Sequence, residues 1–365
     1  MSEPTSSAPR PPVKLYVNPA HVDPALSHTF LLYPFWGAQA KKTEHYATTR
    51  TKHATSADDF ALVATPAEAD YILMAHPYPR LLRFRPDLIA PIIADAEAYG
   101  KPLLIDDAGD HASDISYKNS VIIRIDTYRA THTPQEIIMP VPCEDLLETY
   151  CGGVLQPRPK KDIPSVGFVG WGALSPKQRI RSFIKEIPTR FLSLFVPRYR
   201  VYEKGVFWRE RAVRALIGHP RIETKFIIRS SYSGHVSTAK GDAQKSRQEF
   251  VDNLLDADYA LIVRGDANAA TRFYEALSLG RIPLFLDTEC VLPLEHLINY
   301  RDFCLFVDYA DLPRIATILA DFHATIAPAQ FLAMQQAARA AFEHYLRPDA
   351  FSRELANLLR ARLKQ

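Results

Sequence analysis

Short apolar runs alternate with longer mixed segments along this chain. Runs of about four to seven residues occur at VKLYV (Val13 to Val17), ADYILMA, KPLLID, VGFVG, KFII, YALIV, IPLFL and CLFVD. Such short, nearly uninterrupted runs are typical of strands buried on both faces of a parallel sheet. Helices are expected from Pro86 to Tyr99, from about Pro176 and around Gln248 to Leu255. This alternation predicts an α/β protein with doubly wound sheets.

Length and one polar stretch divide the chain into two domains. Its 365 residues exceed the roughly 100–200 residues of a single domain. The segment GGVLQPRPKKDIPS (Gly152 to Ser165) is rich in Gly, Pro and Lys and marks the boundary. We expect a disordered tail at 1–12, one Rossmann-like domain at 13–155, a second at 165–335, and helices at 336–365.

The segment from Tyr259 to Asp287 carries the strongest functional signal. It predicts a strand, a loop, a short helix and a second strand, with Arg264 at the carboxyl end of the first strand. Ligands bind at those ends in open α/β sheets, and a following helix points its positive dipole end there. Arg272 and Glu275 are three residues apart and therefore share one helix face. A diphosphate between the arginines, with Glu275 near ribose, explains the placement, and a solvated ion pair is the alternative.

The amino-acid sequence of the segment from Tyr259 to Asp287 resembles the signature of a known family. RGDANAATRFYEALSLGRIPLFLD, followed by Leu292 and Pro293, is similar to the exostosin-like glycosyltransferases, and ATPAEADYILMAHPY, IIMPVP and VGFVGWG fit that family in chain order. The resemblance implies a GT-B fold, in which two Rossmann-like domains face a central cleft and C-terminal helices cross back to the first domain. The N-terminal domain would then take the acceptor and the C-terminal domain the donor.

The same resemblance implies an activity. The family transfers a sugar, with inversion, from a nucleotide-diphosphate donor to a saccharide or glycolipid hydroxyl. We expect a UDP-sugar first and a GDP-sugar second, in surface polysaccharide or glycoconjugate synthesis. The leaving-group charge would be met by arginines and a helix end rather than by a metal ion, and no cofactor beyond the nucleotide-sugar is expected. A catalytically inactive glycan-binding or partner protein is the alternative.

Donor-binding candidates lie at the ends of the predicted strands of the second domain. The resemblance carries over Arg264, Gly265, Arg272 and Glu275. Strand ends add Gly170, Arg229, Ser230 and Asp266. Glycine lets a backbone approach phosphate closely, and arginine and serine donate to its oxygens. Ordinary turns are the alternative, and Asp266 or Asn268 equally suits a helix cap.

Candidates for the catalytic base lie in the first domain. Inverting transfer needs a group that accepts the proton of the attacking hydroxyl. The acid-rich loop after KPLLID offers Asp107, Asp110 and His111 beside Asp106, although a turn without chemistry fits the same residues. Glu44, His45 and His76 are held in reserve.

Composition excludes several other classes. Four cysteines without C-x-x-C spacing suggest neither a zinc site nor a disulfide framework. No G-x-G-x-x-G follows a strand, which disfavours an NAD-dependent dehydrogenase. A net charge of +3 and the absence of aromatic–basic interleaving disfavour nucleic acid as a partner. Neither the Ser- and Pro-rich start nor any later stretch resembles a signal peptide or membrane span, so we expect a cytoplasmic protein.

Positive charge is concentrated in the middle of the chain. Residues 158–229 contain 17 Lys or Arg and 5 Asp or Glu. A solvated helical face is the simplest interpretation. The functional alternatives are a field that draws a nucleotide diphosphate to the cleft, or a surface that makes peripheral contact with an anionic membrane.

Overall fold

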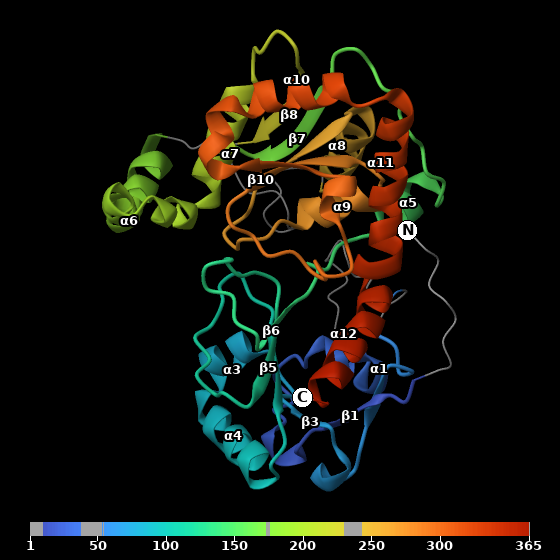
Figure 1. The fold of residues 1–365 in the computed structure, drawn as a ribbon. Coiled ribbons are helices and arrows are strands. Elements are labelled where there is room, and N and C mark those ends of the chain that lie inside the picture. The colour runs from blue at the N-terminus through green and yellow to red at the C-terminus, as the bar shows by residue number, and fades with distance from the viewer. Residues whose placement is uncertain (1–9, 38–52, 54, 173–175, 230–242, 365) are drawn as a thin grey trace.

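Two lobes, each built on one parallel sheet, make up the computed structural model (Figure 1). It describes residues 10–37, 53, 55–172, 176–229 and 243–364. Strands of the first sheet fall between residues 13 and 138 and those of the second between 165 and 308. The expectation of two Rossmann-like domains is confirmed.

The N-terminal sheet has six parallel strands in the order β2-β1-β3-β4-β5-β6. They are β1 (Val13–Tyr16), β2 (Phe60–Leu62), β3 (Tyr71–Leu73), β4 (Leu103–Asp107), β5 (Ser120–Arg124) and β6 (Glu136–Ile138). Every residue of β3 and β4 is buried, because packed elements cover both faces of the sheet. On one face, Leu81 of α3 (Tyr78–Phe84) and Ile92 of α4 (Ile89–Ala98) pack in one cluster with strand residues such as Leu103. A short α1 (Tyr33–Trp36) precedes β2, and α5 (Leu146–Cys151) follows β6.

The C-terminal sheet has five parallel strands in the order β11-β10-β9-β7-β8. They are β7 (Ser165–Trp171), β8 (Glu223–Arg229), β9 (Tyr259–Ile262), β10 (Ile282–Asp287) and β11 (Leu305–Asp308). Its helices are α6 (Pro176–Phe195), α7 (Gly205–Leu216), α8 (Ala243–Asp256), α9 (Thr271–Ser278) and α10 (Ile315–Thr325). The core is largely aliphatic and aromatic, and fully buried Tyr259 and Phe273 belong to it.

Both sheets reverse their strand order at the same place. The chain passes from the first strand to an edge strand and then returns to the other side of the first strand, so β1 lies beside β3 and β7 beside β9. A reversal of this kind leaves a crevice at the carboxyl ends of the two strands, where α/β proteins bind ligands. Each lobe therefore has one topologically defined binding position.

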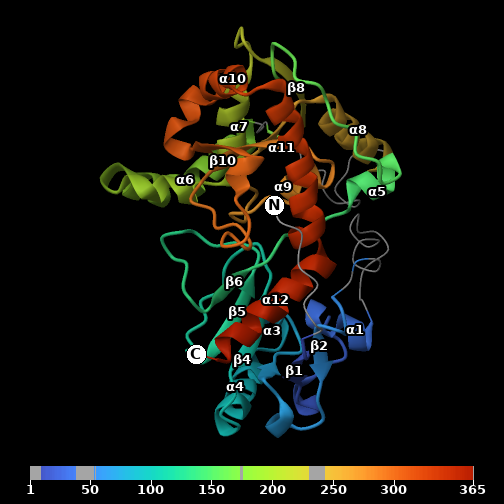
Figure 2. The ribbon, with the colours of Figure 1, turned by 45° about the vertical axis from the view of Figure 1, so that its right-hand side comes forward.

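The C-terminal helices join the two lobes. α11 (Pro328–Ala341) packs on α9 and β10, a π-helical turn follows at Phe342–Leu346, and α12 (Pro348–Arg362) runs along the N-terminal lobe (Figure 2). The hydroxyl of Tyr71 in β3 donates to the Leu359 carbonyl of α12 at 2.9 Å. The crossing confirms the predicted GT-B fold.

No single helix in the described ranges meets the length and apolar content required of a membrane span; one sharply bent pair, Tyr309–Thr325 with Pro328–Leu346, meets them jointly.

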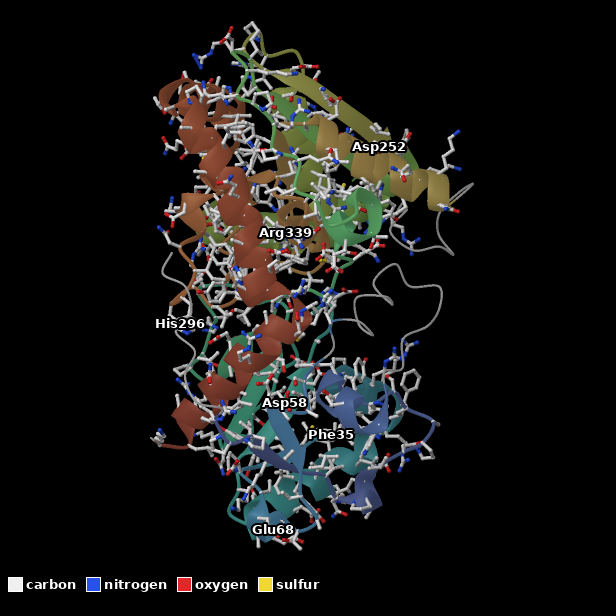
Figure 3. All side chains as sticks on the ribbon, turned by 90° about the vertical axis from the view of Figure 1, so that its right-hand side faces the viewer. Phe35, Asp58, Glu68, Asp252, His296 and Arg339 are labelled. Atoms are coloured by element: carbon white, nitrogen blue, oxygen red, sulfur yellow. The ribbon has the colours of Figure 1, made fainter. Side chains whose placement is uncertain are left out.

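A buried ion pair fixes the crossing helix to the linker between the lobes. Arg339 of α11 donates to Asp145, the N-cap of α5, at 2.7 Å, and to the Ser278 carbonyl of α9 at 2.6 Å. Figure 3 shows Arg339 on the crossing helix beside α5. Because three elements meet at one guanidinium, α5, α9 and α11 are held in a defined relation.

Candidate active site at the facing strand ends

Arg272 lies at the reversal point of the C-terminal sheet. From the first turn of α9, its Nη2 donates to the carbonyl oxygen of Val169 near the end of β7. Its guanidinium carbon lies 4.5 Å from the ring centre of Phe168 and 5.6 Å from that of Phe250. The side chain is only partly buried. A cation is therefore held at the crevice between β7 and β9, where an anionic ligand is expected.

Gly170 makes this position of Arg272 possible. Its φ of 152° is one that residues with a side chain rarely adopt, and a Cβ there would lie 2.7 Å from Arg272 Nη2. The sequence predicted that Gly170 admits a close approach by phosphate. In the structure the approaching group is the guanidinium of Arg272 itself.

Arg264 follows β9 and contacts the opposite lobe. It donates to the hydroxyl of Tyr128 and, at 2.7 Å, to the carbonyl of Glu203. Its Nε is buried and has no hydrogen-bond partner among the residues that the structure describes. The side chain is only 6% exposed, so a ligand reaches it only if the Tyr128 contact opens.

Glu275 lies on the same face of α9 as Arg272, as the spacing predicted. Both side chains meet α8: Arg272 lies near Phe250, and Glu275 accepts from Arg247 Nη1 at 2.6 Å. Arg247 also contacts Glu144, which lies between β6 and α5, at 2.9 Å. One arginine thus neutralises two buried carboxylates from different lobes. The two carboxylates raise the pKa of Arg247 even though burial opposes that rise.

The loop between β9 and α9 is held by Asn268 rather than by a helix cap. The N-cap position of α9 is Ala270, without a side-chain hydrogen bond, so the predicted capping by Asp266 or Asn268 is wrong. The backbone N–H of Asn268 donates to Asp126 at 2.9 Å, and its side-chain amide donates to the carbonyls of Thr127 and Thr288. Asp266 is exposed, and the N–H of Gly265 closes the loop on the Ala269 carbonyl at 3.1 Å.

The remaining donor candidates lie at the end of β8. Arg229 pairs with Glu249 of α8 at 2.5 Å, which directs its charge to a helix surface. Ser230 lies outside the described residues. Neither the pairing nor the position of β8 at the sheet edge favours Arg229 as a primary phosphate ligand.

A cavity of about 820 Å³ occupies the facing side of the N-terminal lobe. The loops after β1, β3, β4 and β6 line it, together with the crossing segment around Phe342 and Phe351. It includes the reversal point between β1 and β3. Cys143 also lines it and is close enough to Glu275 for that carboxylate, second to burial, to raise the pKa of the thiol. The lining residues come from the N-terminal lobe and the crossing segment, and none of them belongs to α9.

Asp107 lies at the end of β4 but is fully buried. Its oxygens accept from the Ser113 hydroxyl at 2.6 Å and from the Ser113 N–H at 2.9 Å, and one of them lies 3.1 Å from Arg124 Nε in an ion pair. Burial raises the pKa of Asp107. These contacts order the loop and leave Asp107 less accessible to an acceptor than Asp110 and His111, which are exposed on that loop.

Two titratable residues line the cavity: Asp106, which the sequence placed in the acid-rich loop beside the base candidates, and His28, which the sequence did not mark. Asp106 accepts from the Thr29 hydroxyl at 2.8 Å and lines the cavity. His28 lines it as well, and its Nε2 lies 2.8 Å from the Gly37 carbonyl. Because a carbonyl oxygen can only accept, this contact places a proton on Nε2 of His28. The sequence did not predict His28 because no motif contains it, and its position in the cavity depends on the conformation of the loop after β1.

His76 is a structural residue rather than a base. Its Nε2 accepts from the Asp23 N–H at 2.9 Å and its Nδ1 donates to the Ser27 carbonyl at 3.0 Å. Both ring nitrogens are engaged in the neutral form, and the ring is 1% exposed. Burial lowers the pKa of His76. The other reserve candidates, Glu44 and His45, lie outside the described residues.

Among the residues with described positions, one group of side chains has ligand atoms close enough for a metal ion. His53, Asp145 and Glu148 place one such atom each within 4.8 Å of the others. Asp145 is already paired with Arg339, and Arg347 lies 3.7 Å from Glu148. Two guanidinium groups beside the carboxylates disfavour a divalent cation there.

Comparison with known proteins locates the family signal in the donor lobe. Residues 210–322 match the Exostosin GT47 domain. The resemblance to exostosin-like glycosyltransferases is confirmed. A probable glycosyltransferase of Arabidopsis thaliana is 29% identical over 85 residues, which make up 23% of this chain and 16% of that protein. The match thus spans about one sixth of that relative.

Similarity to solved structures is wider but weaker. A glycosyltransferase from Rickettsia africae superposes with a TM-score of 0.38 at 10% identity, over 84% of this chain and 86% of that one. TarM gives a TM-score of 0.31 at 11% identity, over 73% and 57% respectively. The GT-B assignment made here follows from the strand orders and the crossing helices of this chain.

Contacts between the lobes are the part of the site that the exostosin-like signature did not reveal. The loop after β5 supplies Asp126 to Asn268, Tyr128 to Arg264, and Arg129 to Asp287 at 2.6 Å. Tyr128 and Cys290 also form an antiparallel bridge. This loop from the N-terminal lobe lies on the C-terminal lobe beside the predicted donor residues, so it connects the strand-end positions of the two lobes.

Proposed function

We propose that this chain is a glycosyltransferase that moves a sugar, with inversion, from a nucleotide-diphosphate donor to a saccharide or glycolipid hydroxyl. A UDP-sugar is the first expectation and a GDP-sugar the second. The reaction needs no metal ion in this proposal, and its product belongs to a surface polysaccharide or glycoconjugate. The exostosin-like match at 210–322 supports the reaction class.

The observation that carries the proposal is the position of Arg272. A partly exposed guanidinium rests on the carbonyl end of β7, beside Gly170, at the reversal point of the donor-lobe sheet. The N-terminal end of α9 adds backbone N–H groups without a side-chain cap. A diphosphate placed there meets a cation and a helix terminus together, which is a favourable site for a leaving group that gains negative charge.

The acceptor belongs in the cavity of the opposite lobe. In the proposed reaction the acceptor oxygen attacks the anomeric carbon in line with the departing diphosphate, so donor and acceptor must occupy facing positions. The hydroxyl proton passes to a base on the acceptor side. His28 and Asp106, which line the cavity, are proposed for that role, and Asp107, Asp110 and His111 of the loop after β4 remain proposals.

A thermal-shift screen tests the function. UDP-, GDP-, CMP- and ADP-sugars are compared at equal concentration, since a ligand that binds only the native state raises its apparent stability with occupancy. We expect one nucleotide class to raise the unfolding temperature, UDP-sugars first. Analysis of the anomeric configuration of the product by NMR then tests inversion.

A binding protein without activity is the second candidate. The engagement of Arg264 by Tyr128 and Glu203 favours it, because a donor ligand must compete with these contacts. No shift with any nucleotide-sugar, together with binding of a free oligosaccharide, would favour this candidate over the enzyme.

A further inference from the structure

Helix α6 carries an apolar face that the described part of the protein leaves exposed. Ile180, Ile184, Ile187, Phe191, Leu194 and Phe195 are between 50% and 77% exposed. Their spacing of three, four and one residues places them on one side of a helix. Single exposed apolar residues are common, but a continuous stripe of this kind marks an interaction surface.

Basic residues border this apolar face. α6 contains five Lys or Arg and one acidic residue, Glu186. By helical spacing, Lys177, Arg181 and Lys185 follow one edge of the stripe and Arg179 the other. An apolar stripe between cationic edges is the pattern of a helix that lies in the interface of a membrane, with its cations at the headgroups.

The location of α6 leaves room for a large partner. Figures 1 and 2 both show the helix extending away from the donor lobe, on the side where the lobes face one another. Among the described contacts, Arg179 pairs with Glu210 of α7, and the turn after the helix, Pro197–Tyr202, packs on it and leads to Glu203. Pro188 interrupts the hydrogen-bonding pattern within it. An apolar medium that covers the exposed face would add to the stability of this helix.

We propose that α6 binds the surface of an anionic lipid bilayer, with its apolar face among the acyl chains and its cations at the headgroups. A symmetric pairing with a second copy is less favourable, because cationic edges would meet cationic edges. Neutral membranes lack the complementary charge. The inference concerns where the protein resides and does not depend on which sugar, if any, it transfers.

Vesicle co-sedimentation of the full chain tests the inference. The probes are vesicles of phosphatidylcholine alone and of an equimolar mixture of phosphatidylcholine and phosphatidylglycerol. We expect binding to the anionic vesicles, weaker binding at high salt, and little binding to the neutral ones. Each neutralised cation should lower the partition coefficient roughly fivefold.

Paired variants separate the apolar and electrostatic contributions. The apolar variant combines Ile187→Asp with Phe191→Asp, and the charge variant combines Lys177→Gln, Arg181→Gln and Lys185→Gln. Matched controls on other surfaces are Leu297→Asp with Leu332→Asp, and Arg221→Gln with Arg301→Gln and Arg314→Gln. Circular dichroism and thermal unfolding confirm that each variant is folded.

Each outcome decides the matter. Loss of vesicle binding in both α6 variants, with controls like the wild type, supports the proposal. Equal binding of the wild type and the apolar variant overturns it, as does equal binding to neutral and anionic vesicles. A wild-type dimer in sedimentation equilibrium that the apolar variant dissolves, without vesicle binding, would show that a second copy covers the face. If the wild type neither binds vesicles nor forms a dimer, the lipid proposal is rejected and a protein partner is the remaining explanation for the exposed face.

Discussion

At the scale of single residues, the site depends on how little space separates Gly170 from Arg272. The guanidinium occupies the volume that any side chain at position 170 would need, since a Cβ there would lie 2.7 Å from its Nη2. A methyl group cannot be accommodated without moving Arg272 away from the Val169 carbonyl. The lack of a side chain at Gly170 therefore determines where the charge of Arg272 lies.

Gly170→Ala should weaken donor binding as well as the fold. We expect a cost of about 1–3 kcal/mol in the free energy of unfolding from the unfavourable φ, and roughly a tenfold loss of nucleotide affinity as Arg272 moves. Gly218→Ala is the matched control, because Gly218 also has a positive φ but has nothing within 4 Å of a Cβ. Urea denaturation and nucleotide titration measure the two effects. Equal nucleotide affinity in both variants would contradict the role given to Gly170.

His76 should make stability depend on pH in one window. Burial lowers its pKa below the ordinary value of 6.5 in the folded state. The unfolded state therefore binds more protons as the pH falls through about 6.5, and the contribution of neutral His76, present above that pH, is lost below it. His76→Gln should be less stable at pH 7.5 yet lose less stability than the wild type between pH 7.5 and 5.5. Denaturant titrations at both pH values measure the free energy of unfolding of the two proteins. Equal losses of stability in the wild type and His76→Gln would reject the role given to His76.

At the scale of elements, the loop after β5 acts as a connection between the lobes. Asn268 of the donor lobe is 1% exposed and bonds both to that loop and, through its side-chain oxygen, to the Thr288 hydroxyl at 2.7 Å. Arg264 meets Tyr128 of the same loop. Any movement of the loop therefore changes the surroundings of a predicted donor residue.

Asn268→Ala should weaken this connection. The carbonyls of Thr127 and Thr288 would lose their donor in a buried place, at a cost of about 2–3 kcal/mol in the free energy of unfolding. Asn299→Ala removes an exposed bond to Asp302 and should cost less than about 0.5 kcal/mol. Chemical denaturation compares the two. Similar costs for both variants would mean that the loop contact does not hold the lobes together.

At the scale of the whole molecule, local patterns predicted the architecture. Apolar runs such as YALIV and IPLFL became β9 and β10, and the breaker-poor C-terminal sequence became the crossing helices. Residues set by one strand–helix unit, Arg272 and Glu275, were also predicted to share a face. Their helical spacing alone determines that relation.

Partners across long sequence distances were not predictable in the same way. Tyr128 and Arg264 are 136 residues apart, and the Glu144–Arg247 pair is separated by 103. No local period encodes which loops meet when two lobes pack. For the same reason, the burial of Asp107 by Arg124 and Ser113 was missed, whereas the acid-rich loop itself was correctly located after β4.

The Lys and Arg side chains of the basic segment 158–229 have different roles in the structure. Arg158 pairs with buried Asp258, and Lys225 pairs with Asp256, so part of the charge is structural. The cations of α6 instead border an exposed apolar stripe. Charge counts alone could not separate these cases, because the distinction lies in what each side chain contacts.

The central claim is that Arg272 holds the diphosphate of an activated sugar at the reversal point of the donor lobe. Isothermal titration of UDP and GDP into the wild type, Arg272→Ala and the exposed control Arg314→Ala tests it most directly. We predict that the wild type and Arg314→Ala bind at least one nucleotide with equal affinity, and that Arg272→Ala binds it about 10–100-fold more weakly, as expected for a lost charge-assisted hydrogen bond. A folded Arg272→Ala protein with wild-type affinity, or no binding of either nucleotide by the wild type, would contradict the claim.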